Sequence, residues 1–567
     1  MRRIMIGLLA SLFAPLIASC GAIDGITGGG GGGGGLPANA VEVTIAYGSE
    51  KQVWMEDVVK RYNDAANKLP SGQQIVITAT PMGSADSLNR ILSGELKPTV
   101  WSPASKILIP VANDAWGKAN NGAKLVEDNA PQLVLSPVVI GMWEPMARAL
   151  GWPDKPIGWG DIAELAASGK TWADYGRPEW GPFQFGHTHP DYSNSGIASI
   201  LAVAYAGTNK TRGLTAADVN ADATKQFMAD VEGSVIHYGE STGFFGTQMF
   251  TRGPSYLSAA VLYENLIIQS RDKTRYPNLS LPIVAIYPKE GTFWTDNPYG
   301  ILNAPWVSAE QREAATAFQN YLLATPQQQL ALQYGFRPAD LNVPLGAPII
   351  AENGVDPQQP RTLLEVPSAD VIAAVRGIWG ENKKRVDVMA VLDISGSMED
   401  EQRLEQAKGA LKTFIGQLSD EDGFGLTIFS NTATVLTEIS PIGPKRQDIL
   451  DRIGGLTAGG GTRLLDTVQE AYQTVGALEA GRRIRAVVVL TDGLDNKSTA
   501  SGDQITALLG QNEEGTSIKV FTIAFGGDAD VDLLKSIATA SGAKAYAPKP
   551  GENGAIEQVY REIATFF

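Results

Sequence analysis

Residues 386–400 read VDVMAVLDISGSMED, an apolar run that ends abruptly in oxygen-bearing side chains. A short apolar run without polar alternation is typical of a strand buried on both faces. Similar runs follow at FGLTIF (424–429), RAVVVL (485–490) and IKVFTIAF (518–525). After the first run, apolar residues recur at a helical spacing, at positions 404, 407, 411, 414, 415 and 418. Strands that alternate with helices predict a mostly parallel, doubly wound α/β domain.

Oxygen donors follow these strands at their carboxyl ends, where sheets of this kind bind ligands. Asp393, Ser395 and Ser397 follow the first strand, and Asp492 follows RAVVVLT. Thr462 comes after a run of three glycines, which can approach other backbone closely. Two carboxylates at one desolvated edge repel each other unless a cation lies between them. An all-oxygen set of ligands suits Mg²⁺ or Mn²⁺ and not zinc.

The alternative for this stretch is an ordinary helix start, because Ser397-Met398-Glu399-Asp400 has the spacing of a capping box. The second carboxylate, that of Asp492, favours a metal site over a helix cap. The set resembles the metal-ion-dependent adhesion site of von Willebrand factor type A domains, with DISGS (393–397), GGGT (459–462) and TDG (491–493). The resemblance covers residues 386–567. It implies a Mg²⁺ (or Mn²⁺) ion held by these three hydroxyls and two carboxylates, and a protein partner that supplies a further carboxylate.

Motifs of catalysis do not accompany these residues. The sequence has no phosphate-binding GxxxxGK[ST] loop, no HExxH and no GxSxG elbow. A phosphotransferase with a strand-end aspartate as nucleophile would want a second aspartate where Ser395 stands. The region from residue 386 onward also lacks histidine, the commonest acid–base catalyst. We therefore expect a binding protein and not an enzyme.

The beginning of the chain indicates export. MRRIMIGLLASLFAPLIASC combines two arginines with an apolar stretch and ends at Cys20, the only cysteine in 567 residues. Its last four residues resemble the lipobox of bacterial lipoproteins, which implies a signal peptide over residues 1–19 and a lipid on Cys20. The alternative is an ordinary secretory signal with an incidental cysteine. Residues 20–40 then form a glycine-rich tether, with a reach of about 25 Å.

Composition narrows the choice of partners. The chain is 44% apolar and 19% charged, as in globular proteins, and its formal net charge of −15 disfavours nucleic acid and anionic membrane surfaces. No later apolar run reaches the ~18 residues that a spanning helix needs. We expect the protein on the extracytoplasmic face of a bacterial cell membrane, held there by its lipid alone.

Residues 41–380 show a looser pattern of alternating strands and helices. VEVTIAYGSE predicts a strand and VWMEDVVKRYNDAAN the helix after it, and QQIVITATPMGSADSLNRIL repeats that order. Ser49, Ser84 and Ser195 stand at the predicted strand-to-helix junctions. Helix N-termini with free amides suit anions or polar solutes. Each serine taken alone is better explained as a helix cap.

Several segments of this region resemble extracellular solute-binding proteins that serve ABC importers. They are SGELKPTVWSPAS (93–105), PVVIGMWEPMARALGWPDKPIGWGDI (137–162), FGHTHPDYSNSG (185–196), VLYENLIIQ (261–269) and YPKEGTFWTDNPYGIL (287–302). The resemblance implies a bilobal, periplasmic-binding-protein-like domain over residues 41–380, with one lobe from 41–135 and 297–380 and the other between them. A small polar or anionic solute would lie in the cleft, and the cleft candidates are Ser49, Ser84, Ser195, Ser241 and Tyr263.

His187 and His189, with Asp191 nearby, admit a metal site. Zinc needs three or four ligands, and only His237 remains among the histidines. Hydrogen bonding within a loop is the better interpretation.

The leading hypothesis is a membrane-anchored binding protein that binds a protein partner through its metal site and carries a solute-binding-like module. The alternative is the substrate-binding component of an ABC importer, with the type A domain as an accessory docking module. A third hypothesis makes the first region a spacer with a degenerate cleft.

Overall fold

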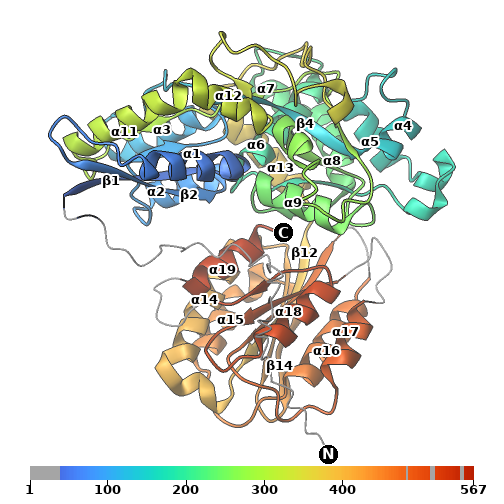
Figure 1. Cartoon of the computed structure of the whole chain (residues 1–567). Coiled ribbons are helices and arrows are strands. Elements are labelled where there is room, and N and C mark those ends of the chain that lie inside the picture. Colours follow the sequence, from blue (N-terminus) through green and yellow to red (C-terminus); the bar gives the residue numbers. More distant parts are fainter. Residues whose placement is uncertain (1–36, 38, 480–482, 511–517, 549–554) are drawn as a thin grey trace, which may run out of the picture.

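The computed structural model describes residues 37, 39–479, 483–510, 518–548 and 555–567. The predicted signal peptide, Cys20 and nearly all of the tether lie outside these residues. Within the described part, no helix is both long enough and apolar enough to cross a bilayer. The chain forms two bodies, an upper and a lower one in Figure 1, joined through residues 383–385.

The smaller sheet of the first body has the strand order β10-β3-β1-β2. Its strands are β1 (Ala40–Gly48), β2 (Gln74–Met82), β3 (Val100–Ser102) and β10 (Gly300–Ile301). Strand β1 is parallel to β2 and β3, as the strand–helix repeat predicts. Helix α1 (Gln52–Asp64) buries Trp54, Met55, Val58 and Tyr62, which lie on one stripe of a 3.6-residue period. Helices α2 (Ser84–Leu92), α3 (Leu108–Ala119), α11 (Ala309–Leu323) and α12 (Thr325–Gln333) belong to the same part of the chain.

The larger sheet of the first body has the order β11-β4-β7-β5-β6, with β8 and β9 also paired to β4. The strands are β4 (Val134–Trp143), β5 (Phe185–Thr188), β6 (Val235–Gly239), β7 (Ala259–Tyr263), β8 (Ile283–Ile286), β9 (Trp294–Thr295) and β11 (Arg337–Pro338). Its helices include α5 (Trp159–Ala167), α6 (Asn194–Thr208), α7 (Ala216–Val219), α8 (Asp222–Gly233), α9 (Thr242–Arg252) and α10 (Glu264–Gln269). Helix α6 is apolar on almost every side and is accordingly buried over residues 194–205.

The end of the first region does not lie where the sequence placed it. We expected residues 297–380 to return to the first lobe. Helix α13 (Ala369–Asn382) instead packs against α6, α7 and α8 of the second lobe. The reason is its apolar stripe, since Val371, Val375 and Ile378 are buried there.

The second body is a sheet with the order β14-β13-β12-β15-β16-β17. Strands β12 (Val386–Asp393), β13 (Gly423–Phe429), β15 (Ile484–Thr491), β16 (Lys519–Ala524) and β17 (Ala545–Tyr546) are parallel, and β14 (Ala433–Pro441) is antiparallel. The predicted doubly wound α/β fold is therefore confirmed.

Helices cover both faces of this sheet. Val388, Ala390 and Leu392 of β12 lie in one hydrophobic cluster, and Met389 and Val391 lie in another. The first cluster includes side chains of α14 (Arg403–Gln417), α15 (Arg446–Gly454) and α19 (Ala555–Ala564). The second includes α16 (Leu464–Gly476), α17 (Gly502–Leu509) and α18 (Val531–Ala540). The even and odd residues of β12 thus face opposite layers, as in any central strand.

The amino ends of the parallel strands face the first body. Three residues separate the end of α13 from the start of β12, and Asp422, which precedes β13, lies in the seam between the bodies. The end of the chain closes this seam, because Tyr238 N donates a hydrogen bond to Phe566 O (3.3 Å) and the Phe566 ring stacks on His237 at 4.5 Å. The carboxyl ends of the strands therefore point away from the first body (Figure 1).

One lysine of the seam should make stability depend on pH. Burial, together with Arg252 nearby, lowers the pKa of Lys519 to about 7, from 10.5 for a free side chain. The unfolded state then binds more protons than the folded state between these two values, so stability should rise with pH from about 7 to about 10.5. Unfolding temperatures across this window should show the rise in the wild type and a flatter profile in Lys519→Met. Equal slopes would contradict the assignment.

Candidate metal centre and interlobe cleft

Two neighbouring parallel strands deliver the carboxylates of the candidate metal centre. Asp393 ends β12, Asp492 directly follows β15, and the two strands run side by side in register. Ser395 N donates to Asp393 Oδ1 (2.7 Å), and Thr491 Oγ1 donates to Asp393 Oδ2 (2.5 Å). Both carboxylates are fully buried. The strand ends therefore bring the two predicted acidic residues to one edge of the sheet.

The two serines connect these carboxylates. Ser395 Oγ and Ser397 Oγ lie 3.2 Å apart, and Ser397 Oγ donates to Asp492 Oδ1 (2.7 Å). Ser397 does not cap a helix, since its hydroxyl is used on Asp492 and α14 begins only at Arg403. The capping-box alternative does not describe this stretch.

The glycine run brings Thr462 to the same place. Gly459 N donates to Ile394 O (2.8 Å), and Gly396 N donates to Gly460 O (3.0 Å). Gly460 has a φ of +92°, which favours glycine there. Thr462 Oγ1 and Ser397 Oγ lie 3.4 Å and 3.5 Å from the position that a Cβ on Gly493 would occupy. All five predicted oxygen-bearing side chains thus converge on one edge.

The electrostatics of this edge fit a cation. Burial, and to a smaller degree the Asp492 carboxylate, raise the pKa of Asp393 to about 6, against the hydrogen bonds from Thr491 and Ser395. Within the described ranges, no three His, Cys, Asp or Glu side chains are grouped to hold a metal. A metal here would therefore rely on hydroxyl oxygens beside two carboxylates. Such a set suits Mg²⁺ or Mn²⁺.

Sequence reasoning missed three residues that support the edge. Arg403, the first residue of α14, donates from Nη1 to Asp492 Oδ2 at 2.9 Å. Thr491 holds Asp393, and Asn496 accepts from Thr462 N at 3.0 Å. Thr491 is the first residue of the TDG motif and Asn496 follows the motif closely, so both could have been noted from their positions. Arg403 lies ten residues beyond Asp393, and no local signal marked it.

The cleft candidates lie among polar groups of the protein itself. Ser195 Oγ is 2.6 Å from Thr188 Oγ1 and accepts from Thr242 Oγ1 (2.9 Å). Thr242 Oγ1 also lies 3.4 Å from the Tyr263 hydroxyl oxygen. Ser195 and Tyr263 therefore share one buried network. Burial raises the pKa of Tyr263 above its usual range, so its hydroxyl stays protonated.

The other three cleft candidates are spread around this network. Ser49 Oγ accepts from Gly243 N (3.2 Å), at the start of α9. Ser84 Oγ accepts from Ala104 N (3.0 Å). Ser241 is buried next to Thr242 at the amino end of α9. The structure brings Ser49, Ser195, Ser241 and Tyr263 to the region around α9. Ser84 is not part of this group, because its hydroxyl is bonded to Ala104 of the first lobe.

The two lobes touch through backbone at this cleft. Ala85 N and Asp86 N, at the amino end of α2, donate to Tyr192 O of the other lobe at 3.1 Å and 2.9 Å. A Cβ added to Gly83 would lie 2.3 Å from the same oxygen. The two amides at the amino end of α2 that could receive an anion are therefore occupied by the protein's own carbonyl.

Replacing Gly83 by alanine should force the lobes apart at this contact. Overpacking of this kind costs about 1–3 kcal/mol of unfolding free energy. Gly377→Ala in α13 is the control, because nothing lies within 4 Å of its added Cβ. That change should instead stabilise the helix by about 0.5–1 kcal/mol. Urea unfolding of both variants measures the difference, and a Gly83→Ala variant as stable as the wild type would show that the lobes separate freely.

The histidine pair serves hydrogen bonding. His187 Nε2 lies 3.0 Å from Glu232 Oε1, and His187 Nδ1 lies 2.8 Å from Thr188 O. His189 Nδ1 accepts from Asp191 N (3.2 Å). The two imidazoles therefore have separate partners, and the predicted hydrogen bonding is present, although His187 lies in strand β5 and not in a loop.

Comparisons with known proteins agree with this architecture. The family model of bacterial extracellular solute-binding proteins matches residues 43–337, and that of the von Willebrand factor type A domain matches residues 387–561. An uncharacterized protein of Mycobacterium tuberculosis is 25% identical over 527 residues, which cover 86% of this chain and 72% of the relative.

Solved structures resemble each body separately. A periplasmic thiamin binding protein has 15% identity and a TM-score of 0.44, over 61% of this chain and 97% of its own. A von Willebrand factor type A protein from Catenulispora acidiphila has 21% identity and a TM-score of 0.27, over 32% of this chain and 42% of its own.

The fold, with its interlobe cleft and the oxygen-rich edge of the second sheet, defines a binding protein built from a bilobal module and a type A domain. The chain belongs to the bacterial extracellular solute-binding protein family and carries a C-terminal von Willebrand factor type A domain. Both matched families are typically binding modules. Membership of the first family indicates an extracytoplasmic location.

Proposed function

We propose that this protein binds a protein partner through a Mg²⁺ or Mn²⁺ ion at the carboxyl edge of its type A domain. The observation that carries the proposal is the convergence of two buried carboxylates and three hydroxyls at that edge. Asp393, Ser395, Ser397, Thr462 and Asp492 would hold the ion. When bound, the ion supplies an electrophilic centre that accepts an oxygen ligand from outside.

The metal, and not the protein's own charges, would attract an anionic partner. The Arg403 guanidinium donates to Asp492 Oδ2 (2.9 Å) and also lies near Glu401 (3.4 Å) and Asp528 (3.9 Å). A divalent cation balances the two site carboxylates, and an open coordination position on it would accept a carboxylate from the partner. The edge faces away from the first body, so a partner can reach it without displacing that body.

We assign the first body the role of carrying the type A domain away from a membrane anchor. The contacts of Tyr192 O with α2 support this role, because they occupy the cleft. A lipid on Cys20 would supply the anchor, and Cys20→Ala should release the protein from membranes. The second candidate is an importer receptor, which the family match over residues 43–337 favours. That function requires the cleft to open and to release Tyr192.

The test is adhesion of the purified protein to cell envelopes of its own bacterium in the presence of Mn²⁺. Chelation of the metal should abolish adhesion. Amidation of the envelope carboxylates with a carbodiimide and an amine should abolish it too, because the partner's carboxylate is then lost. Adhesion that survives either treatment would contradict the proposal. Solute uptake that fails in a deletion strain, without any metal-dependent adhesion, would favour the importer receptor.

A further inference from the structure

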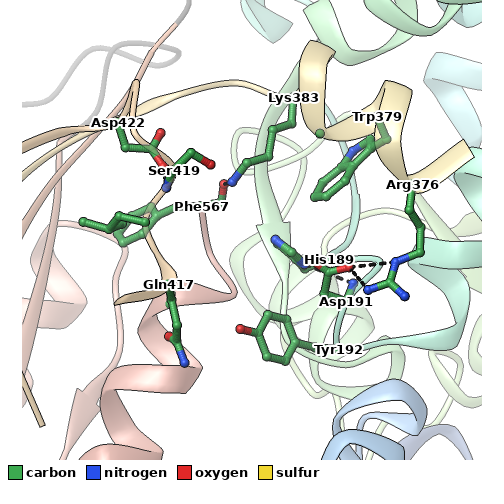
Figure 2. Close-up of a pocket in the computed structure, with 13 residues that line it drawn as sticks. His189, Asp191, Tyr192, Arg376, Trp379, Lys383, Gln417, Ser419, Asp422 and Phe567 are labelled. Atoms are coloured by element: carbon green, nitrogen blue, oxygen red, sulfur yellow. Dashed lines mark hydrogen bonds and ion pairs between the residues drawn. The ribbon is translucent and has the colours of Figure 1, made fainter. Parts of the chain in front are cut away.

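A cavity of about 190 Å³ lies in the seam between the two bodies (Figure 2). The first body lines it with the loop of residues 189–192 and with α13, and the second lines it with residues 417–419, Asp422 and Phe567. The cavity is distinct from the interlobe cleft and from the metal edge, the group formed by Asp393, Ser395, Ser397, Thr462 and Asp492. Any molecule inside it would contact both bodies at once.

Donors on the first-body side of the cavity have unused hydrogens. Lys383 Nζ crosses the seam and donates to Phe567 O (2.9 Å), which uses one of its three hydrogens (Figure 2). Arg376 directs Nε and Nη2 to Asp191 Oδ1 and keeps its other amino group for further bonds. His189 Nδ1 is an acceptor, so the ring hydrogen lies on Nε2. Burial lowers the pKa of His189 to about 3, which keeps the imidazole neutral.

The charged acceptors around the cavity already have donors, whereas the side-chain oxygen of Gln417 is a buried acceptor without one. Asp422 accepts from Val386 N (3.1 Å) and from Ser419 N (2.8 Å). Asp191 accepts from Arg376, and Phe567 O accepts from Lys383. The cavity therefore has more free hydrogens to donate than free oxygens to accept, which suits an acceptor-rich molecule. Partial burial also lowers the pKa of Lys383, and an anion beside the ammonium would offset this desolvation.

We propose that the cavity binds a small organic carboxylate, whose oxygens accept hydrogen bonds from Lys383, His189 and Arg376. The volume sets the size, since a cavity of about 150 Å³ holds benzene. A molecule of roughly six to ten non-hydrogen atoms therefore fits. Trp379 and Leu418 provide an apolar wall for its carbon atoms. Such a ligand would bridge the two bodies and stabilise their docking.

The test compares carboxylates with their neutral amides by thermal unfolding of the whole protein. Benzoate and succinate at about 10 mM should raise the unfolding temperature by about 2 °C or more, because a ligand that binds only the folded state stabilises it. Benzamide and succinamide should not. Lys383→Gln should lose the response, since glutamine can still donate to Phe567 O but has no charge. Lys384→Gln removes the same charge from the join without lining the cavity, and it should keep the response.

A second pair of variants distinguishes loss of ligand binding from loss of folding. Gly380 lines the cavity in α13, and nothing lies within 4 Å of a Cβ added there. Gly380→Leu should fill the cavity and abolish the response while the protein stays folded. Gly377→Leu, one turn earlier on an open surface, should leave the response intact. Equal shifts with the amides, a shift with inorganic phosphate alone, or no shift with any of these compounds would overturn the proposal; the last result would mean ordered water only.

Discussion

Replacing Asp393 by asparagine is expected to lower the affinity for Mn²⁺ by more than about 100-fold. Loss of a residue that only orients a metal ligand costs about 10–100-fold, and loss of a carboxylate of the site itself should cost more. Asparagine has nearly the same shape and can still accept the hydrogen bond that Ser395 N donates at 2.7 Å. Its amide nitrogen replaces the oxygen that accepts from Thr491 Oγ1, and that hydroxyl can turn to accept instead. The effect therefore reports mainly the loss of charge. Isothermal titration of the whole protein with Mn²⁺ measures it directly.

The matched control for this change lies on the same strand. Asp387 is at the opposite end of β12, in the seam half of the sheet, and pairs with Arg483 at 2.8 Å. Asp387→Asn should bind Mn²⁺ with the wild-type affinity and stoichiometry. If Asp393→Asn also did so, the metal would bind elsewhere, and the convergence of hydroxyls and carboxylates would need another explanation.

The metal edge was predictable because its determinants are local. The apolar runs that became β12 and β15 are continuous, and each ends at the aspartate that the motif contains. Parallel neighbours place such ends together without further information. Strand β14 was not predicted, because it is an edge strand with mostly exposed or half-buried residues and no clear alternation. Arg403 was missed for a related reason, since its partner Asp492 is remote in sequence.

The features of the first body that could not be predicted from the sequence depend on contacts between distant segments. The strand–helix pattern predicted β1, α1, β2 and α2, and it proposed serines for a cleft. It could not show that Tyr192 O would cap α2 from the other lobe, about a hundred residues away in the chain. Any serine at a helix start can serve a ligand or the protein, and only the packed structure decides between them.

Replacing Lys51 by methionine is expected to destabilise the first body by about 3–5 kcal/mol. The ammonium of Lys51 is fully buried near the carboxyl ends of β1 and β3 and donates to Glu50 Oε1 (2.7 Å), Asn297 Oδ1 (2.9 Å) and Ser102 O (3.2 Å). Methionine fills a similar volume but leaves the buried carboxylate of Glu50 without its cation, which is the costly half of breaking such a pair. Urea unfolding of the first body measures the loss.

Lys60→Met is the control, because it removes the same charge from an exposed place in helix α1, which begins directly after Lys51. Lys60 pairs with Asp64 at 2.5 Å, but their side chains are 75% and 63% exposed, so the change should cost less than about 1 kcal/mol. Similar losses in the two variants would mean that water or a proton reaches Glu50. The comparison also bears on function. Asn265, in α10 of the second lobe, donates from Nδ2 to Glu50 O (3.1 Å), so this internal ion pair lies where the lobes meet. A large loss for Lys51→Met would show that the cleft is part of the stable core, which favours a carrier of the type A domain over a clamshell that opens for solute.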